Sequence, residues 1–382
     1  MSVFSHPDFD HHELLAFRDD PTTGLKAIIA VHNSSLGPAT GGCRMFPYAS
    51  DEAALSDVLR LSRGMTYKSA LAGLALGGGK SVIIGNPHQE KSRELMLAMG
   101  DFIDSLGGKY TSAEDSGTGV SDIATMAERT NFVTGLMASD TEHGGDPSPT
   151  TAYGVYRGIC SAVAYKGGNL SGLRVALQGI GNVGYYLARH LIEAGAVVYA
   201  ADINRKNIDR AVNELGVTEL PLGEVLSADV DVLAPCAMGG SINQASIESI
   251  KAGIVSGAAN NQLATADMGE ALRARGILYA PDYVINAGGI IDVYYQSAGN
   301  HDVDVVTEHV NRIGNTLTQI FTRSDGEGKA TSVIADVMAE EIFKQPAALA
   351  AAQLSNGISN NGDTNNGAKN NGATNNSKTV AA

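Results

Sequence analysis

The stretch from Arg174 to Asn204, RVALQGIGNVGYYLARHLIEAGAVVYAADIN, constrains the fold more than any other part of this chain. An apolar, strand-like segment runs into Gly179, Gly181 and Gly184, and a helical pattern follows these glycines. A second apolar segment, VVYAAD, then ends at Asp202, 18 residues after Gly184. Strand, glycine turn, helix, strand and terminal acid in this order predict a Rossmann-type dinucleotide-binding domain, with an ordinary glycine turn as the alternative.

The residues of this turn have distinct physical tasks. Gly179 permits a tight turn, Gly181 lets a pyrophosphate approach the backbone, and Gly184 allows helix and strand to pack closely. Asp202 accepts hydrogen bonds from a ribose diol and repels a 2′-phosphate, which favours NAD over NADP, although the neighbouring Arg205 leaves that preference open. The cofactor-binding residues predicted here are Gly179, Ile180, Gly181, Asn182, Val183, Gly184 and Asp202.

The length of the chain predicts more than one domain. A sequence of 382 residues with 43% hydrophobic content exceeds what one core usually supports, so we expect two domains with a cleft between them. We place an N-terminal α/β substrate-binding and oligomerisation domain at 1–140 and the Rossmann-type NAD-binding domain at 141–325. Helices at about 325–350 are expected to complete the first domain. The Asn-rich repeats at 354–382 offer almost nothing apolar to bury, so we expect a disordered tail.

Composition excludes several classes of protein. No apolar run reaches the length of a membrane span and the N-terminus lacks the pattern of an export signal, so we expect a soluble, cytoplasmic protein. A net charge of −14 without a basic, aromatic cluster disfavours nucleic-acid binding. Cys43, Cys160 and Cys236 lie far apart, which predicts reduced, mostly buried thiols. We expect no metal site, because His143, assigned to a surface loop, has no second ligand at a useful spacing.

The run GLALGGGKSVIIG raises the question of what Lys80 does. Five residues separate Gly73 from Gly79, whereas a phosphate-binding P-loop has four before its Gly-Lys pair, so an ATP site is disfavoured. The preceding segment, SDEAALSDVLRLSRGMTYKSA, has acidic residues and apolar spacing that predict a helix leading to Lys68. The segment KSVIIG is typical of a strand, with Lys80 at its entrance. We also expect a linking helix over TAYGVYRGICSAVAYKGG.

Eight blocks in order resemble one known family, the glutamate, leucine, valine and phenylalanine amino-acid dehydrogenases, and most of all its leucine dehydrogenase branch. The resemblance covers about residues 25–345. Besides the dinucleotide unit, the blocks are LGPATGGCRM, LSRGMTYKSALAGLALGGGKSVI, YTSAEDSGTGVSD, PSPTTAYGVYRGI, APCAMGGSIN, GAANNQLA and PDYVINAGGIIDV.

The resemblance implies roles for particular residues. Lys68 binds the α-carboxylate, Lys80 is the catalytic lysine that polarises the reacting oxygen, and Asp115 is the proton-transfer carboxylate. Thr151 and Asn286 contact the nicotinamide. The substrate-side residues implied are Lys68, Gly41, Gly42, Met65, Thr40, Ala113, Asn261, Ile290 and Val293.

Residue chemistry adds two expectations of its own. Two nearby ammonium groups in a partly desolvated cleft disfavour each other's charge, so we expect the pKa of at least one lysine to be lowered. Gly77, Gly78 and Gly79 have no side chains, which would let substrate and nicotinamide lie close to the backbone beside Lys80.

The expected substrate follows from four pocket positions. Glutamate-specific members carry a lysine where this chain has Thr40, and burying a second carboxylate without that cation is costly. Ala113, Ile290 and Val293 are apolar and of modest size, which predicts a branched aliphatic L-amino acid. Valine, phenylalanine and tryptophan stay open, because one methylene discriminates by only about 1–3 kcal/mol.

The sequence thus predicts an NAD-dependent oxidoreductase that converts an aliphatic amino acid and its 2-oxo acid plus ammonia into each other. We expect a homo-oligomer between a dimer and an octamer. A non-catalytic NAD-binding sensor is the competing interpretation, which the presence of Lys68, Lys80 and Asp115 disfavours.

Overall fold

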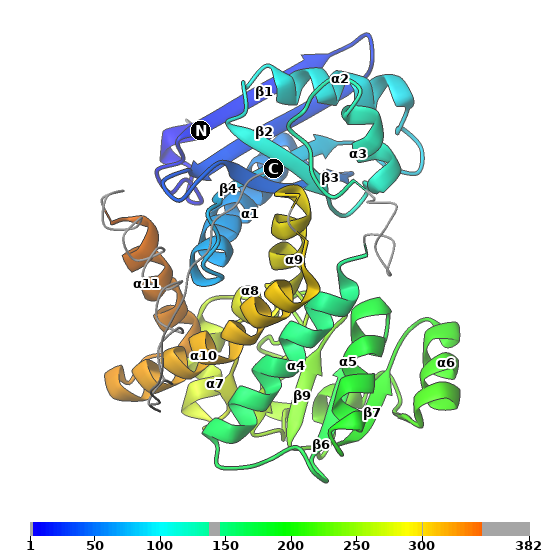
Figure 1. Cartoon of the computed structure of the whole chain (residues 1–382), viewed down its shortest axis with the longest axis vertical. Coiled ribbons are helices and arrows are strands. Elements are labelled where there is room, and N and C mark those ends of the chain that lie inside the picture. The colour runs from blue at the N-terminus through cyan, green and yellow to red at the C-terminus, as the bar shows by residue number, and fades with distance from the viewer. Residues whose placement is uncertain (1–2, 137–145, 300, 346–382) are drawn as a thin grey trace, which may run out of the picture. The chain divides into compact units, whose positions relative to one another are not determined.

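The computed structural model describes residues 3–136, 146–299 and 301–345. The expectations for His143 and for the tail at 354–382 lie outside these residues. The described chain builds two β-sheets, each covered by helices (Figure 1).

The first sheet has five strands in the spatial order β1-β2-β4-β3-β5. Strands β3, β4 and β5 run parallel, whereas β2 is antiparallel to both β1 and β4. The strands are β1 (Leu14–Asp20), β2 (Leu25–Asn33), β3 (Ala39–Phe46), β4 (Gly77–Ile84) and β5 (Tyr110–Glu114).

Both faces of this sheet are buried, because alternate side chains of one strand point to opposite sides. On β2, Ile28 packs against helix α1 (Asp51–Leu71), while the adjacent Ile29 packs against α2 (Arg93–Asp104). A short helix, α3 (Val120–Met126), lies beside α2 (Figure 1). This double coverage explains why the middle of β2, from Ala27 to Val31, is a continuous apolar run.

Helix α1 confirms the predicted helix. The side chain of Ser50 caps its first turn by accepting a hydrogen bond from the backbone nitrogen of Ala53, and two acidic residues follow the cap. The helix ends at Leu71, before Gly73 takes a positive φ of 67°. Lys68 therefore lies on the last turn of a rigid element.

The prediction for β4 was wrong at its start. The strand begins at Gly77, so Lys80 lies inside it and not at its entrance. Glycine has a low intrinsic preference for strands, which hid these residues from a sequence pattern. Pairing with β2 on one side and β3 on the other makes the glycine segment a central strand.

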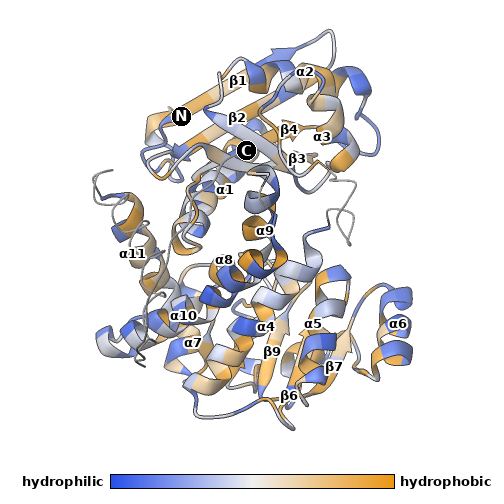
Figure 2. Ribbon diagram, viewed as in Figure 1, coloured by the Kyte–Doolittle hydropathy of each residue, from blue (hydrophilic) through white to orange (hydrophobic). Residues whose placement is uncertain are grey.

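The second sheet is wholly parallel, with the spatial order β11-β10-β9-β6-β7-β8. Numbered within this sheet, the order is that of a dinucleotide-binding fold, so the Rossmann prediction is confirmed. Figure 2 shows β7 and β9 as predominantly hydrophobic, as expected for strands buried on both faces. The strands are β6 (Arg174–Gln178), β7 (Val197–Ala201), β8 (Thr218–Glu219), β9 (Val232–Pro235), β10 (Ile254–Val255) and β11 (Leu278–Tyr279).

Helices surround the second sheet and connect it to the first. The predicted linking helix is confirmed as α4. Helix α11 reaches α1, where the hydroxyl of Tyr67 donates to Glu340 over 2.7 Å.

The division of the chain into domains at the expected boundaries stays a prediction. The helices are α4 (Ser148–Tyr165), α5 (Asn182–Glu193), α6 (Arg205–Leu215), α7 (Asp267–Ala274), α8 (Asp282–Ile285), α9 (Gly288–Ser297), α10 (Val303–Glu327) and α11 (Thr331–Phe343), with short 3₁₀ turns η1 (Val3–Ser5), η2 (Val225–Ser227) and η3 (Ile247–Ser249).

Two further sequence expectations concern the helices and the thiols. Among the described residues, no helix combines the length and the apolar character that crossing a membrane requires. The three thiols are unpaired, as expected; Cys43 is buried, whereas Cys160 and Cys236 are only partly so.

Candidate active site

A cavity of about 350 Å³ collects the residues that the sequence assigned to catalysis and substrate binding. Its walls come from β3, β4, β5, α1, α9 and the loop before α8. All eleven expected residues line it: Thr40, Gly41, Gly42, Met65, Lys68, Lys80, Ala113, Asp115, Asn261, Ile290 and Val293.

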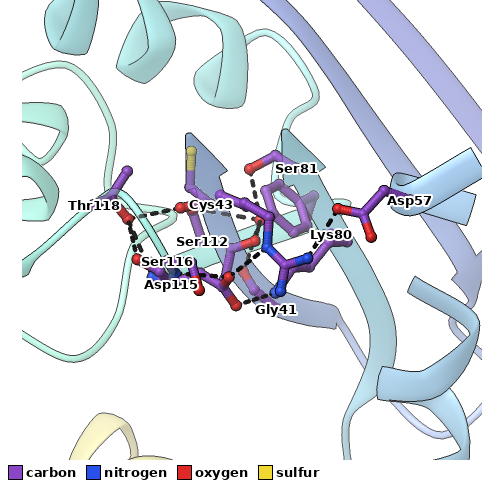
Figure 3. Close-up of polar contacts among 12 residues, drawn as sticks. Gly41, Cys43, Asp57, Lys80, Ser81, Ser112, Asp115, Ser116 and Thr118 are labelled. Atoms are coloured by element: carbon purple, nitrogen blue, oxygen red, sulfur yellow. Dashed lines mark hydrogen bonds and ion pairs between the residues drawn. The ribbon is translucent and has the colours of Figure 1, made fainter. Parts of the chain in front are cut away.

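Lys80 and Asp115 meet at the floor of this cavity. Lys80 is only 4% exposed as a residue, and its ammonium group contacts Oδ2 of Asp115. The other oxygen, Oδ1, accepts hydrogen bonds from Nε of Arg44 over 2.9 Å and from the backbone nitrogen of Ser116 over 2.7 Å. Thr118 holds the same loop, because its hydroxyl donates to the carbonyl of Cys43 (Figure 3). The parallel pairing of β3, β4 and β5 brings these groups together.

The charge state of Asp115 follows from its neighbours. Burial by itself would raise the pKa of this carboxyl, but the charges of Lys80 and then Arg44 outweigh burial and lower the pKa to about 2. The carboxylate is therefore ionised at neutral pH and can accept a proton.

Lys68 confirms the expectation of a lowered lysine pKa. Burial is the largest cause and the charge of Lys80 adds to it, while Asp282 opposes both, so that the pKa falls to about 8. The sequence interpretation named only the repulsion between the two lysines, which is the smaller effect. An ammonium group with this pKa exchanges protons near neutral pH.

Asp282 is a residue of this cavity that sequence reasoning missed. Its buried carboxylate accepts hydrogen bonds from the backbone nitrogens of Gln262 and Tyr283, over 2.9 and 2.7 Å. Burial raises the pKa of Asp282, and these hydrogen bonds and the charge of Lys68 oppose that rise. The neighbouring Asn261 has a positive φ of 52°, so the carboxylate holds a strained loop in place. Its position inside the quoted block PDYVINAGGIIDV was the signal that the sequence offered.

The three glycines before Lys80 have a different purpose from the one expected. A methyl group added to Gly77 would lie 2.4 Å from the carbonyl of Asn33, and one added to Gly78 would lie 2.1 Å from the backbone nitrogen of Thr66. The protein itself fills the space beside these glycines. They permit close packing of β4 against β2 and α1, and the Cβ directions do not open onto a ligand.

The dinucleotide turn has the geometry that its sequence predicted. Gly179 takes a φ of 97°, and a methyl group on Gly184 would meet the carbonyl of Gly179 at 2.4 Å. A methyl group on Gly181, in contrast, would have no described protein atom within 4 Å. Close packing therefore explains Gly184, while Gly181 faces open space at the N-terminus of α5.

Thr151 and Asn286, the residues expected at the nicotinamide, are not among the residues that line the cavity. A methyl group on Gly289 would meet the hydroxyl of Thr151 at 2.6 Å, so the glycines after Asn286 let α9 approach the start of α4 closely. The amide nitrogen of Asn286 donates to Asn260 over 2.6 Å, while its buried Oδ1 has no hydrogen-bond partner among the described residues.

Family models match the chain on both sides of residues 137–145, which the structure does not describe. Residues 12–132 match the Glu/Leu/Phe/Val dehydrogenase dimerisation domain, and residues 146–205 and 201–325 match the Glutamate/Leucine/Phenylalanine/Valine dehydrogenase domain. The chain belongs to this amino-acid dehydrogenase family. The expected enzyme class and the resemblance to leucine dehydrogenases are thereby confirmed.

Individual relatives cover most of this dehydrogenase. A leucine dehydrogenase from Bacillus cereus is 45% identical over 89% of this chain and 93% of its own. A valine dehydrogenase from Streptomyces virginiae is 42% identical over 89% and 96%. The crystal structure of L-tryptophan dehydrogenase from Nostoc punctiforme superposes with a TM-score of 0.77 at 40% identity, covering 87% of this chain and 96% of that one.

The side-chain end of the dehydrogenase cavity is uncharged at the four positions named from the sequence. Thr40 is 8% exposed, and its hydroxyl makes one long hydrogen bond of 3.4 Å to the carbonyl of Pro38. The lining also includes charged residues that sequence reasoning missed: besides Asp282, these are Arg44, Arg60 and Glu114, of which Arg60 is exposed. The four-residue pocket therefore offers apolar contact and one hydroxyl.

Proposed function

We propose that this dehydrogenase catalyses the NAD-dependent, reversible oxidative deamination of a branched aliphatic L-amino acid to its 2-oxo acid and ammonia. The observation that carries the proposal is the convergence of Lys68, Lys80, Asp115 and an uncharged four-residue pocket in a single cavity. Those groups are what the reaction requires: an anchor for the α-carboxylate, a proton-transfer pair, and a dry site for an aliphatic group.

The residues of the Rossmann domain fit NAD. Open space at Gly181 suits a pyrophosphate, and the unpartnered oxygen of Asn286 suits the amide nitrogen of a nicotinamide. Arg205 forms ion pairs with Asp209 and Glu219, so its guanidinium group is already engaged and is less available to the 2′-phosphate of NADP. NAD, when bound, accepts the hydride from the α-carbon of the substrate.

Lys68 is proposed to bind the α-carboxylate of the substrate. Its side chain is half-buried at the wall of the cavity, and no hydrogen bond from its ammonium group is formed within the described chain. A carboxylate ligand would form a charge-assisted hydrogen bond with it and would stabilise its protonated form.

Lys80 and Asp115 are proposed to carry out the proton transfers. Lys80 would polarise the carbonyl oxygen of the 2-oxo acid, or hold the attacking water in the deamination direction. Oδ2 of Asp115 lies at the ammonium group of Lys80, so the same oxygen is within reach of a substrate nitrogen held there.

The side chain of the substrate is proposed to lie against Thr40, Ala113, Ile290 and Val293. None of the four carries a charge, so a substrate carboxylate buried there would lack a partner. Leucine, isoleucine and valine are expected to be oxidised well and glutamate poorly.

An aromatic substrate is the second candidate within the same enzyme class. It is favoured by the 40% identical tryptophan dehydrogenase and by the small side chain of Ala113, which leaves room for a larger ligand. The proposed chemistry at Lys68, Lys80 and Asp115 would be the same.

We further propose a cytoplasmic homo-oligomer. The match of residues 12–132 to a dimerisation domain supports self-association, as does the position of β1 at the edge of its sheet with Phe17 57% exposed. Light scattering behind size-exclusion chromatography would give the subunit number, and a monomer at micromolar concentration would contradict this proposal.

A substrate panel tests the proposed function. The kcat/KM values for leucine, valine, phenylalanine, tryptophan and glutamate would be followed by NADH absorbance. We expect the aliphatic substrates to exceed glutamate by about a thousandfold, because an unpaired buried carboxylate costs several kcal/mol. A clear preference for an aromatic amino acid would overturn the aliphatic assignment but not the proposed reaction. Glutamate as best substrate would contradict the pocket argument, and an Arg60→Ala variant would then test whether that exposed cation supplies the partner.

A further inference from the structure

The two carboxylate oxygens of Asp115 have different partners. Oδ2 contacts the ammonium group of Lys80, whereas Oδ1 accepts hydrogen bonds from Nε of Arg44 and from the backbone nitrogen of Ser116. Figure 3 shows Lys80 and Ser116 on either side of the labelled Asp115. The hydrogen-bond donors to Oδ1 therefore determine the orientation of the carboxylate, and with it which oxygen faces the cavity.

Arg44 is itself held from the opposite side. Its Nη1 donates to Oδ2 of Asp57 over 2.9 Å, and the hydroxyl of Tyr48 donates to the same oxygen over 2.5 Å. Asp57 lies on α1 and is not among the residues that line the cavity. An ordered chain of alternating charge thus runs from α1 through Arg44 and Asp115 to Lys80.

We propose that Arg44, fixed by Asp57 and Tyr48, is a positioning residue that holds Oδ1 of Asp115, so that Oδ2 is the oxygen presented to Lys80 and to the substrate. This inference rests on the proposed oxidative deamination, in which Asp115 transfers the proton. Guanidinium suits the task because it is planar and always charged, and its separate nitrogens bind two carboxylates in fixed directions. A lysine at position 44 would supply the charge from a single nitrogen, without the rigid fork that sets the directions of the two hydrogen bonds.

The same arrangement predicts a pH effect. Both Lys80 and Arg44 lower the pKa of Asp115 against the effect of burial, so loss of Arg44 alone should raise that pKa while Lys80 stays in place. The titratable groups that face Asp115 are Lys80 on β4, Arg44 and Cys43 on β3, Tyr48 after β3, Lys68 on α1, and Tyr110 and Glu114 on β5.

The experiment compares four variants with wild type. Arg44→Gln removes the charge and Arg44→Lys keeps it, while Asp57→Asn loosens the anchor from outside the cavity. Arg63→Gln is the matched control, because Arg63 also joins two carboxylates, Asp10 and Asp336, away from Asp115. For each variant, kcat/KM is measured across pH with the best substrate of the wild-type enzyme, and the melting temperature is recorded in parallel.

We expect Arg44→Gln to lower kcat by at least about tenfold and to move the acidic limb of the profile upward by about one pH unit. Asp57→Asn should move the acidic limb of the kcat/KM profile upward by less than Arg44→Gln does. Arg44→Lys should have the acidic limb of the wild type but a lower kcat. Arg63→Gln should lower the melting temperature with an unshifted limb.

An unshifted acidic limb in folded Arg44→Gln and Asp57→Asn enzymes would overturn the inference, and so would an equal shift in Arg63→Gln. If Arg44→Gln does not fold, Asp57→Asn decides by itself. A wild-type protein that oxidises no amino acid of the panel would instead refute the proposed function, so the two failures are distinguishable.

Discussion

The carboxylate of Asp202 accepts a hydrogen bond over 2.8 Å from the backbone nitrogen of Ile180, which lies in the glycine turn. Its other oxygen accepts from the backbone nitrogen of Asn204 over 2.7 Å. The acid at the end of β7 and the turn after β6 are therefore fixed relative to each other by the chain alone, which aligns the predicted ribose and pyrophosphate positions.

This geometry predicts the cofactor preference. We expect kcat/KM with NAD to exceed that with NADP by at least about tenfold, because the Asp202 charge repels a 2′-phosphate. Asp202→Asn keeps an oxygen that can accept a hydrogen bond from Ile180 but removes the charge. It should therefore lower the ratio of kcat/KM with NAD to kcat/KM with NADP. Equal use of both cofactors by the wild-type enzyme would contradict the assignment.

Two glycines of the turn should respond differently to alanine. Gly184→Ala places a methyl group 2.4 Å from the carbonyl of Gly179 and should destabilise the protein by about 1–3 kcal/mol. Gly181→Ala meets no described protein atom, so it should leave the melting temperature nearly unchanged while weakening NAD binding about tenfold or more. Denaturant titration and calorimetric NAD binding test the pair, and similar stability losses in both variants would refute the distinction.

The two lysines should differ in kinetics. Lys80→Ala should lower kcat by about a hundredfold to a thousandfold, because a group that stabilises charge in the transition state is lost. Lys68→Ala should also raise KM for the amino acid strongly, since the carboxylate anchor is removed. NAD binding, measured by fluorescence, should survive in both. Wild-type kinetics in either variant would contradict its role.

Asp282 should support the protonated state of Lys68. The pKa of Lys68 is about 8, and Asp282 opposes a further decrease, so Asp282→Asn should lower that pKa. The measurement is the affinity of a non-reacting analogue, such as 4-methylpentanoate, as a function of pH. In Asp282→Asn, this affinity should begin to decrease at a lower pH than in the wild type. A one-unit decrease would weaken binding about fivefold at pH 8. An unchanged limb, with affinity lost equally at every pH, would indicate only a distorted Asn261 loop.

His32 should make stability depend on pH. Burial and then the neighbouring His12 lower its pKa from 6.5 to about 4, although Asp10 opposes them. Because the folded pKa is below the unfolded one, the unfolded chain binds more protons between these values. Stability is full above pH 6.5 and decreases as the pH falls toward 4, by about 2 kcal/mol at pH 5.

The matched variants are His32→Gln, which should flatten this dependence, and His88→Gln at an exposed position, which should retain it. Urea titrations between pH 7.5 and 5 give the slopes. Equal slopes in wild type and His32→Gln would assign the acid sensitivity to other groups.

The sequence by itself determined the elements whose signals are local. The dinucleotide unit at 174–204 was readable because its strand, glycine turn, helix and acid are consecutive, and α1 because its cap and apolar spacing lie within one segment. The residues that the family resemblance assigned to substrate and catalysis lie around one cavity, because eight ordered blocks placed them, while their roles stay predictions.

Only the tertiary structure decided which of those residues meet and why. The predicted strand began at Lys80, because glycine has a low preference for strands, yet pairing on both sides places Gly77 to Gly79 in a central strand. Asp282 lies 214 positions after Lys68 in the chain, and Asp57 lies 58 before Asp115, so no local pattern relates them. Their interactions depend on sheet register and helix packing, and burial then shifts their pKa values by removing the water that would otherwise screen the charges.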